Sequence, residues 1–181
     1  KRNFLRRRCR LVDFRYRSAV YSRVIETETN CKVMFFSNLG NCFQAKVQDL
    51  PEAKYKDKGF ALKQVFGEAQ AGEYPVAVFA MPVEDMPQGE LLFFTRQGLI
   101  KRTEWSEYKL LKNVFQGYKI KDNDELFDVQ AVNPNSQVFY VTNRGGCTKF
   151  NVDEIPLQGR VASGVKCITL GSGEYVVAAA Q

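Results

Sequence analysis

Histidine is absent from the 181-residue chain, and its five cysteines are scattered and form no C-x-x-C pair. A zinc site needs several soft ligands close together, so the sequence argues against a metal site and favours reduced, buried cysteines. The lack of histidine also removes the most common general acid–base, so no Ser/His/Asp or Cys/His catalytic arrangement can form. These absences argue against many classes of hydrolase.

Long apolar runs are also missing, because no stretch approaches the roughly 18 apolar residues of a membrane-spanning helix. The basic N-terminal segment is not followed by the continuous apolar stretch of a signal peptide. With 45% hydrophobic residues, the chain nevertheless has enough apolar material for a core. We therefore expect a soluble, cytoplasmic protein with no membrane partner.

Positive charge is concentrated at one end of the chain. Residues 1–23 hold nine Lys and Arg against one Asp, whereas the remaining residues carry a net charge of −2. Guanidinium groups match the geometry of phosphate oxygens, so this segment favours contact with phosphate. The alternative is a solvated basic tail.

Most of the chain consists of three copies of one unit. Each copy opens with an apolar strand, a hydroxyl residue, two variable residues and a glycine, at residues 33–40, 91–98 and 138–145. This pattern predicts a hairpin with its glycine at positive φ. Further matches follow: an acid nine residues after each glycine, a second glycine nineteen residues after it, and an acid before the closing strand. These positions are Asp49, Glu107 and Glu154; Gly59, Gly117 and Gly164; and Glu73, Glu125 and Glu174.

The repeats indicate an all-β, propeller-like fold with about four strands per unit. Opening strands such as 33–36 and 91–94 are apolar on both faces and therefore need cover on both sides. We expect a basic segment with the end of a partial blade at 1–30, then blades at 31–88, 89–135 and 136–181. In the partial blade we expect a closing strand at 19–25 and a turn at 26–30. The one candidate helix is 105–114, and a duplicated β-sandwich is the alternative fold.

Residues 98–103, with the sequence Gly-Leu-Ile-Lys-Arg-Thr, and 106–108, Ser-Glu-Tyr, resemble a known signature. It is the G-x-x-K-R-T…s-E-[FY] signature of the C-terminal repeats in the A subunits of DNA gyrase and topoisomerase IV. Residues 150–166 and 35–59 look like two further blades, and the resemblance covers residues 19–181. It implies a β-pinwheel, here a partial ring of four-stranded blades that exchange strands.

The resemblance also implies a function. In that family the outer rim of the disc binds and bends duplex DNA for an ATP-dependent type II topoisomerase, an isomerase that controls supercoiling or decatenates DNA. The partners would be duplex DNA, the rest of the A subunit, and the ATPase B subunit. The complex would lie in the cytoplasm at the nucleoid. This chain would hold no cofactor, since ATP and Mg²⁺ act elsewhere, and it lacks the context of the catalytic tyrosine.

One departure concerns the Gln-Arg-Arg-Gly-Gly-x-Gly box of gyrase A subunits, which this chain does not contain. Its absence favours a topoisomerase IV-type subunit. The alternative is a gyrase A domain from which the box has been lost or cut away.

Candidate phosphate contacts lie in the basic segment and at equivalent places in successive repeats. They are Arg6, Arg7, Arg8, Arg10, Lys56, Lys58, Arg96, Lys101, Arg102, Lys119, Arg144, Lys149, Arg160 and Lys166. Neighbouring strand residues point to opposite faces, so Lys101 and Arg102 do not share a surface. We favour Arg102, because the equivalent residues Gln44 and Lys149 are also polar. No recognition helix or zinc finger is evident, so we expect little base readout.

Two other functions remain as alternatives. A protein-interaction propeller of the WD40 or kelch type would need a Trp-Asp or double-glycine pattern in each blade, and Trp105 is followed by serine. A propeller enzyme would need clustered acids, but the repeated acids occur one per unit. We therefore expect these acids to cap turns or pair with nearby cations.

Overall fold

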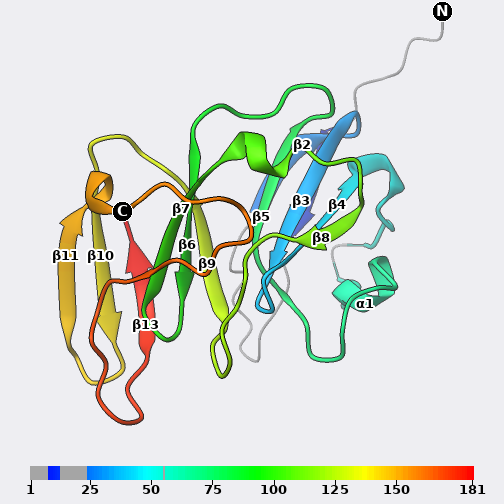
Figure 1. Ribbon diagram of the computed structural model, residues 1–181. Coiled ribbons are helices and arrows are strands. Elements are labelled where there is room, and N and C mark those ends of the chain that lie inside the picture. Colours follow the sequence, from blue (N-terminus) through cyan, green and yellow to red (C-terminus); the bar gives the residue numbers. More distant parts are fainter. Residues whose placement is uncertain (1–7, 13–23, 55) are drawn as a thin grey trace, which may run out of the picture.

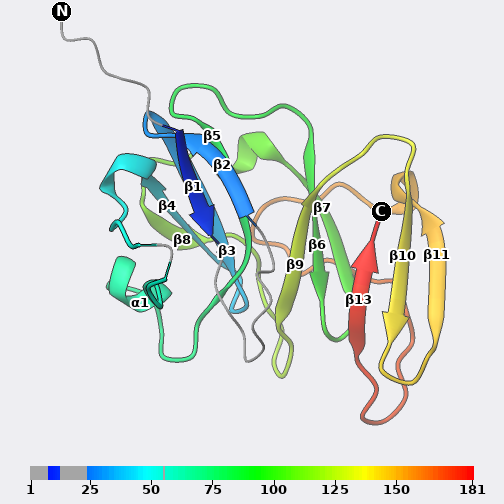
Figure 2. The ribbon, with the colours of Figure 1, turned by 180° about the vertical axis from the view of Figure 1, so that it is seen from behind.

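The computed structural model describes residues 8–12, 24–54 and 56–181, and for 8–12 and Val24 it describes the backbone alone. Three antiparallel sheets stand side by side, each formed around one hairpin of the repeat (Figures 1 and 2). The chain is all-β with short helical turns, which confirms the predicted fold class. No helix in these residues is long and apolar enough to cross a membrane.

The first sheet has the strand order β5-β3-β4-β8 and the second has the order β9-β6-β7-β12. The strands of the first are β3 (Cys31–Ser37), β4 (Asn41–Lys46), β5 (Pro75–Pro82) and β8 (Val114–Gln116). Those of the second are β6 (Glu90–Thr95), β7 (Leu99–Glu104), β9 (Leu126–Ala131) and β12 (Val165–Lys166).

The third sheet has the order β13-β10-β11, so among the described residues it has three strands instead of the predicted four. It contains β10 (Gln137–Thr142), β11 (Cys147–Asn151) and β13 (Val176–Ala180). A separate hairpin pairs β1 (Arg8–Val12) with β2 (Val24–Glu28). The predicted closing strand at 19–25 lies mostly outside the described residues. The predicted turn at 26–30 is wrong over its first half, because β2 runs to Glu28.

Neighbouring repeats exchange strands. β8 belongs to the second repeat in sequence yet pairs with β4 of the first sheet, and β12 of the third repeat pairs with β7 of the second. Each four-stranded sheet is therefore completed by the repeat that follows it. The proposed blade boundaries stay a prediction, because a sheet and a sequence repeat are not the same unit.

The hairpin turns follow the predicted design. Gly40, Gly98 and Gly145 have φ values of +80°, +73° and +81°. In each turn the serine or threonine three residues before the glycine accepts a hydrogen bond through its hydroxyl oxygen. The donor is the backbone N–H of the residue that follows the glycine, at 3.1 Å. The repeated serine or threonine therefore closes the turn that the glycine allows.

The acid before the closing strand braces this turn in two repeats. Glu73 accepts a hydrogen bond from Ser37, and Glu174 accepts one from Thr142, both at 2.5 Å. In the second repeat the equivalent acid is Asp124, which accepts the Gln97 N–H at 2.9 Å. The prediction that Glu125 is the equivalent of Glu73 and Glu174 is therefore wrong by one residue.

The second glycine recurs at a fixed spacing in the sequence, but it does not recur at the same place in the structure. Gln116 pairs with Asn41 and Lys166 pairs with Leu99, and both partners directly follow a turn glycine. Gln116 lies 18 residues after the turn glycine of its own repeat and Lys166 lies 21 after its own. Of the glycines at position nineteen, Gly117 therefore directly follows the donated strand β8, whereas Gly164 directly precedes the donated strand β12.

Short 3₁₀ helices follow the second strand of each hairpin: η1 (Val47–Asp49), η2 (Trp105–Tyr108) and η3 (Val152–Glu154). The candidate helix at 105–114 is thus a single 3₁₀ turn followed by a loop that leads into β8. Its apolar residues Trp105 and Tyr108 are buried because they seal the space between sheets, and no amphipathic helix forms. One short helix, α1 (Leu62–Val65), was not predicted.

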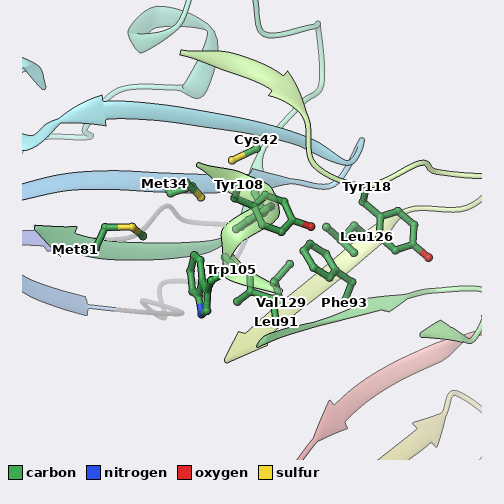
Figure 3. Packing of buried hydrophobic residues seen from close by; sticks show 12 residues of the cluster. Met34, Cys42, Met81, Leu91, Phe93, Trp105, Tyr108, Tyr118, Leu126 and Val129 are labelled. Atoms are coloured by element: carbon green, nitrogen blue, oxygen red, sulfur yellow. The ribbon is translucent and has the colours of Figure 1, made fainter. Parts of the chain in front are cut away.

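Aromatic side chains fill the space between the first two sheets (Figure 3). Phe36 of β3 and Phe93 of β6 meet edge to face with ring centres 5.3 Å apart, and Tyr108 stacks on Phe93 at 5.8 Å. Their strand neighbours Phe35 and Phe94 are also buried, on the opposite faces of the same sheets. This confirms the expectation that the opening strands are covered on both sides. Among the cysteines, Cys42 is buried as predicted but Cys147 is exposed.

Candidate nucleic-acid interface

The inner edges of the sheets are formed by β5 and β9, which contact each other. The opposite, outer edges are formed by β8, β12 and β11. Figure 1 shows β5 and β9 in the middle of the molecule and β11 at its far side. A ligand that follows the rim would therefore meet the outer edge strands and the loops that lead into them.

A set of exposed lysines follows these outer edges, and we call it the rim lysines. They lie beside β8, on β12 and on β11, and the set is Lys109, Lys112, Lys119, Lys149 and Lys166. Among the described residues, none of them forms an ion pair with a carboxylate. Exposed ammonium groups without internal partners are suited to phosphate.

The predicted arginines of the second repeat are occupied within the protein. The Arg96 guanidinium forms an ion pair with Glu125 at 3.3 Å and donates to the Val176 carbonyl of the third sheet at 2.9 Å. The Arg102 guanidinium lies 3.1 Å from Glu90 and 3.4 Å from Asp153 of η3, with only 17% of its side chain exposed. Both arginines link adjacent repeats. The favoured role of Arg102 in phosphate contact therefore does not fit the structure.

Lys101 is fully buried, so its prediction as a phosphate contact is wrong. Its Nζ lies 4.7 Å from the ring centres of both Phe93 and Tyr118 and donates to the Arg160 carbonyl at 2.5 Å. Burial, followed by the nearby charge of Arg160, lowers the pKa of Lys101 to about 7. The side chain holds the crossing loop of the third repeat against the second sheet.

Arg160 reaches back from that loop to β8. Its guanidinium lies over the ring of Phe115, with 5.4 Å from Cζ to the ring centre, and donates to the Gln116 carbonyl. Arg144 is exposed but donates to the Ser172 carbonyl at 2.5 Å. These arginines, like Arg96 and Arg102, chiefly fix loops in place.

The remaining predicted contacts have different outcomes. Lys56 and Lys58 are exposed on the loop between η1 and α1. Arg6 and Arg7 lie outside the described residues, and the side chains of Arg8 and Arg10 in β1 are not described. Their role in phosphate contact stays a prediction.

Sequence reasoning missed Lys109 and Lys112 because it compared only positions that recur in every repeat. Both flank a Leu-Leu pair in the loop between η2 and β8, and the pattern of lysines around exposed apolar residues was the available signal. It also missed Lys32 and Lys46, which are cross-strand partners on β3 and β4. Burial, and to a smaller extent the positive charge of Lys109, lower the pKa of Lys32.

An acidic cleft also borders this loop, with Lys109 in its lining. It is an open hollow between the loop after β5 and η2, and its lining includes Glu84, Asp85, Glu90, Glu104 and Lys109. Carboxylates of this kind repel phosphate, so the cleft itself does not favour a bound duplex.

The repeated acids do not form a catalytic group. Asp49, Glu107 and Glu154 lie one on each 3₁₀ helix, and Glu154 accepts the Asn151 N–H at 2.9 Å as a cap. Glu107 accepts the Arg160 N–H at 3.3 Å. In the described part of the chain, no three His, Cys, Asp or Glu side chains are grouped to hold a metal ion.

Comparison with known proteins gives a consistent result. The family model described as the DNA gyrase C-terminal domain, beta-propeller, matches residues 32–59, 89–133 and 137–181. The A subunit of DNA topoisomerase 4 from Bacillus subtilis is 32% identical over 155 residues, which are 84% of this chain and 19% of that protein. The A subunit of DNA gyrase from Ureaplasma parvum is 30% identical over 156 residues, which are 86% of this chain and 18% of that protein.

Solved structures agree with this match. The crystal structure of the C-terminal domain of DNA topoisomerase IV superposes with a TM-score of 0.80 at 27% identity, covering 92% of this chain and 52% of that one. A DNA gyrase A C-terminal domain gives a TM-score of 0.63 at 19% identity, covering 93% and 54%, and supports the fold alone. The chain thus spans about half the length of these solved domains and about a fifth of the curated relatives. With its matched repeats and its strand-exchanged sheets, the chain belongs to the family of DNA gyrase C-terminal, β-propeller domains.

Proposed function

We propose that this chain is a non-catalytic module that holds and bends duplex DNA on the outer edges of its sheets. The observation that carries the proposal is the row of rim lysines, which are exposed and have no carboxylate partner among the described residues. The cations that would compete for this role, such as Arg96 and Arg102, are engaged within the fold. Family membership supplies the ligand class.

The module would serve an ATP-dependent type II topoisomerase, as part of an A subunit that works with the ATPase B subunit in the cytoplasm, at the nucleoid. ATP and Mg²⁺ would act elsewhere in that enzyme, and the duplex on the rim would be presented for strand passage. We favour a topoisomerase IV-type parent, because the chain contains no Gln-Arg-Arg-Gly-Gly-x-Gly box.

The test is binding of the chain to linear duplexes of increasing length across a salt series. Rim binding predicts affinity that rises with duplex length, and a log–log salt plot whose slope is about −0.9 per phosphate engaged. The double variant Lys119→Ala/Lys166→Ala should flatten the slope by about 2, since each lysine accounts for about 1. A matched control is Lys63→Ala on α1, an exposed lysine that lies on none of the outer edge strands β8, β12 and β11. No binding to any duplex at low salt would overturn the proposal.

A further inference from the structure

The loop between η2 and β8 presents a leucine to solvent. Leu111 is fully exposed, at 103%, whereas the other exposed large apolar side chains in the described residues reach 50% at most. Isolated apolar residues on a surface usually need no explanation. Leu111 differs because Lys109 and Lys112, both exposed, lie on either side of it in the same loop.

The backbone around Leu111 is fixed from below. The buried side chain of Gln44 donates from Nε2 to the carbonyls of Leu110 and Lys112, at 2.6 and 2.7 Å. The Gln44 backbone N–H also donates to the Asn113 carbonyl at 2.8 Å. One residue of β4 therefore holds the carbonyls on both sides of Leu111, so the leucine stands on a preorganised support.

Two further lysines lie on β3 and β4, close in register to Gln44. Lys32 and Lys46 pair across β3 and β4, and because Lys46 is two residues from Gln44, it lies on the same face of the sheet. The acidic cleft with Glu84 and Asp85 also has Lys109 in its lining. A polyanion that approaches the loop is attracted by Lys109 and Lys112 and meets the exposed Leu111 between them.

We propose that Leu111 is an apolar wedge that inserts between base pairs of the bound duplex, while Lys109 and Lys112 bind the phosphates on either side. The inference rests on the proposed function and adds a kinking point to it. Apolar wedges partly unstack a base step and kink DNA by about 20–90°. Flexible pyrimidine–purine steps such as TA would be the preferred points of insertion.

The experiment uses the whole 181-residue chain and a duplex with TA steps that carries 2-aminopurine beside one step and a fluorophore pair at its ends. Binding of the unaltered chain should raise the 2-aminopurine signal and shorten the end-to-end distance. Leu111→Ala should abolish the rise in the 2-aminopurine signal and reduce the shortening to the part that the rim lysines alone produce. Its affinity should change by roughly tenfold at most, because apolar burial and unstacking are of similar size. Val83→Ala, an exposed apolar truncation beside the acidic cleft, should behave like the unaltered chain.

The outcomes separate the two proposals. If the unaltered chain binds but Leu111→Ala unstacks and bends the duplex equally well, the wedge is wrong and the DNA-holding function stands. If the unaltered chain binds no duplex at low salt, both are wrong. Circular dichroism and the urea midpoint should be unchanged in Leu111→Ala, since its side chain contributes nothing to the core.

Discussion

At the scale of single residues, Lys101 shows how one position can change chemistry between repeats. The first repeat has the buried Phe43 at the equivalent place, and the second has a buried lysine whose pKa is lowered to about 7 by burial and by Arg160. A lysine in the unfolded chain has a pKa of about 10.4. Between these values the unfolded chain binds more protons, so the free energy of unfolding rises with pH.

We expect Lys101 to make the free energy of unfolding rise by up to about 1.4 kcal/mol per pH unit between about pH 7 and 10. Below about pH 7 its contribution should not change with pH. Lys101→Met should remove it, so the stability difference between variant and unaltered chain should narrow or reverse as the pH rises. Urea unfolding at several pH values across this window measures that difference. Lys149→Met, at an exposed site on β11, is the control, and parallel pH curves for Lys101→Met and the unaltered chain would contradict the assignment.

Arg102 gives a second prediction at this scale. Its ion pairs with Glu90 and Asp153 tie the second sheet to η3, so Arg102→Ala should lower the free energy of unfolding by about 1 kcal/mol. Duplex affinity and its salt slope should stay unchanged. Lys112→Ala should have the opposite pattern, with unchanged stability and a slope reduced by about 1. A salt slope that falls equally in both variants would show that Arg102 contacts phosphate after all.

At the scale of elements, the turn glycines differ in which segment of the chain packs against them. A Cβ on Gly40 would overlap the carbonyl oxygen of Tyr118, and one on Gly98 would lie 2.5 Å from Cγ2 of Ile168. Both contacts belong to segments that the following repeat donates. Gly145 has the same positive φ, but no atom lies within 4 Å of its Cβ position.

Gly145→Ala should therefore cost only the backbone strain of positive φ, about 1–2 kcal/mol. Gly98→Ala should cost about 1–3 kcal/mol more, because a packed neighbour must move as well. Urea denaturation of the two variants gives the comparison directly. Equal losses would mean that the donated segment is not packed on the turn.

These elements also show what could be predicted from the sequence. The opening strands and the turns at Gly40, Gly98 and Gly145 were predictable from the sequence. The apolar run, the hydroxyl residue and the glycine that determine them lie within a few residues of one another. The register of the donated strands was not, because β8 and β12 pair with residues far away and their loops differ in length. For the same reason the ion pair between Arg102 and Asp153 could not be foreseen, since Asp153 comes from the next repeat.

At the scale of the whole molecule, the sheets are linked in series by shared strands. The residues that tie them, such as Arg96 and Tyr118, donate across repeats to the carbonyls of Val176 and Ser163. The cations that form no such contacts between repeats include the exposed lysines of the rim. This separation explains why arginines at the repeated positions, such as Arg96 and Arg102, are engaged within the fold. The exposed rim lysines come both from the repeated positions (Lys119, Lys149 and Lys166) and from outside them (Lys109 and Lys112).

The third sheet differs from the first two in its unshielded outer face. Phe139 of β10 is 42% exposed, whereas the equivalent residues Met34 and Leu92 are fully buried by the next sheet. Val177 of β13 is also 42% exposed. Among the described residues no strand pairs with the outer edge of β11, which therefore offers free backbone donors and acceptors beside this apolar face. Exposed sheet edges and apolar patches of this kind favour association.

We therefore expect the 181-residue chain to self-associate as its concentration rises, through the face that carries Phe139. Phe139→Lys should shift sedimentation velocity profiles towards the monomer, because a charge on this face must be desolvated when two copies meet. Val83→Lys introduces the same charge at a site that is 41% exposed and lies on the first sheet's side, so it should leave the profiles unchanged. Its duplex binding should match that of Phe139→Lys, since neither residue is one of the rim lysines. Monomer at every concentration, or equal profiles for Phe139→Lys and the unaltered chain, would show that the third sheet is stable in water without a cover.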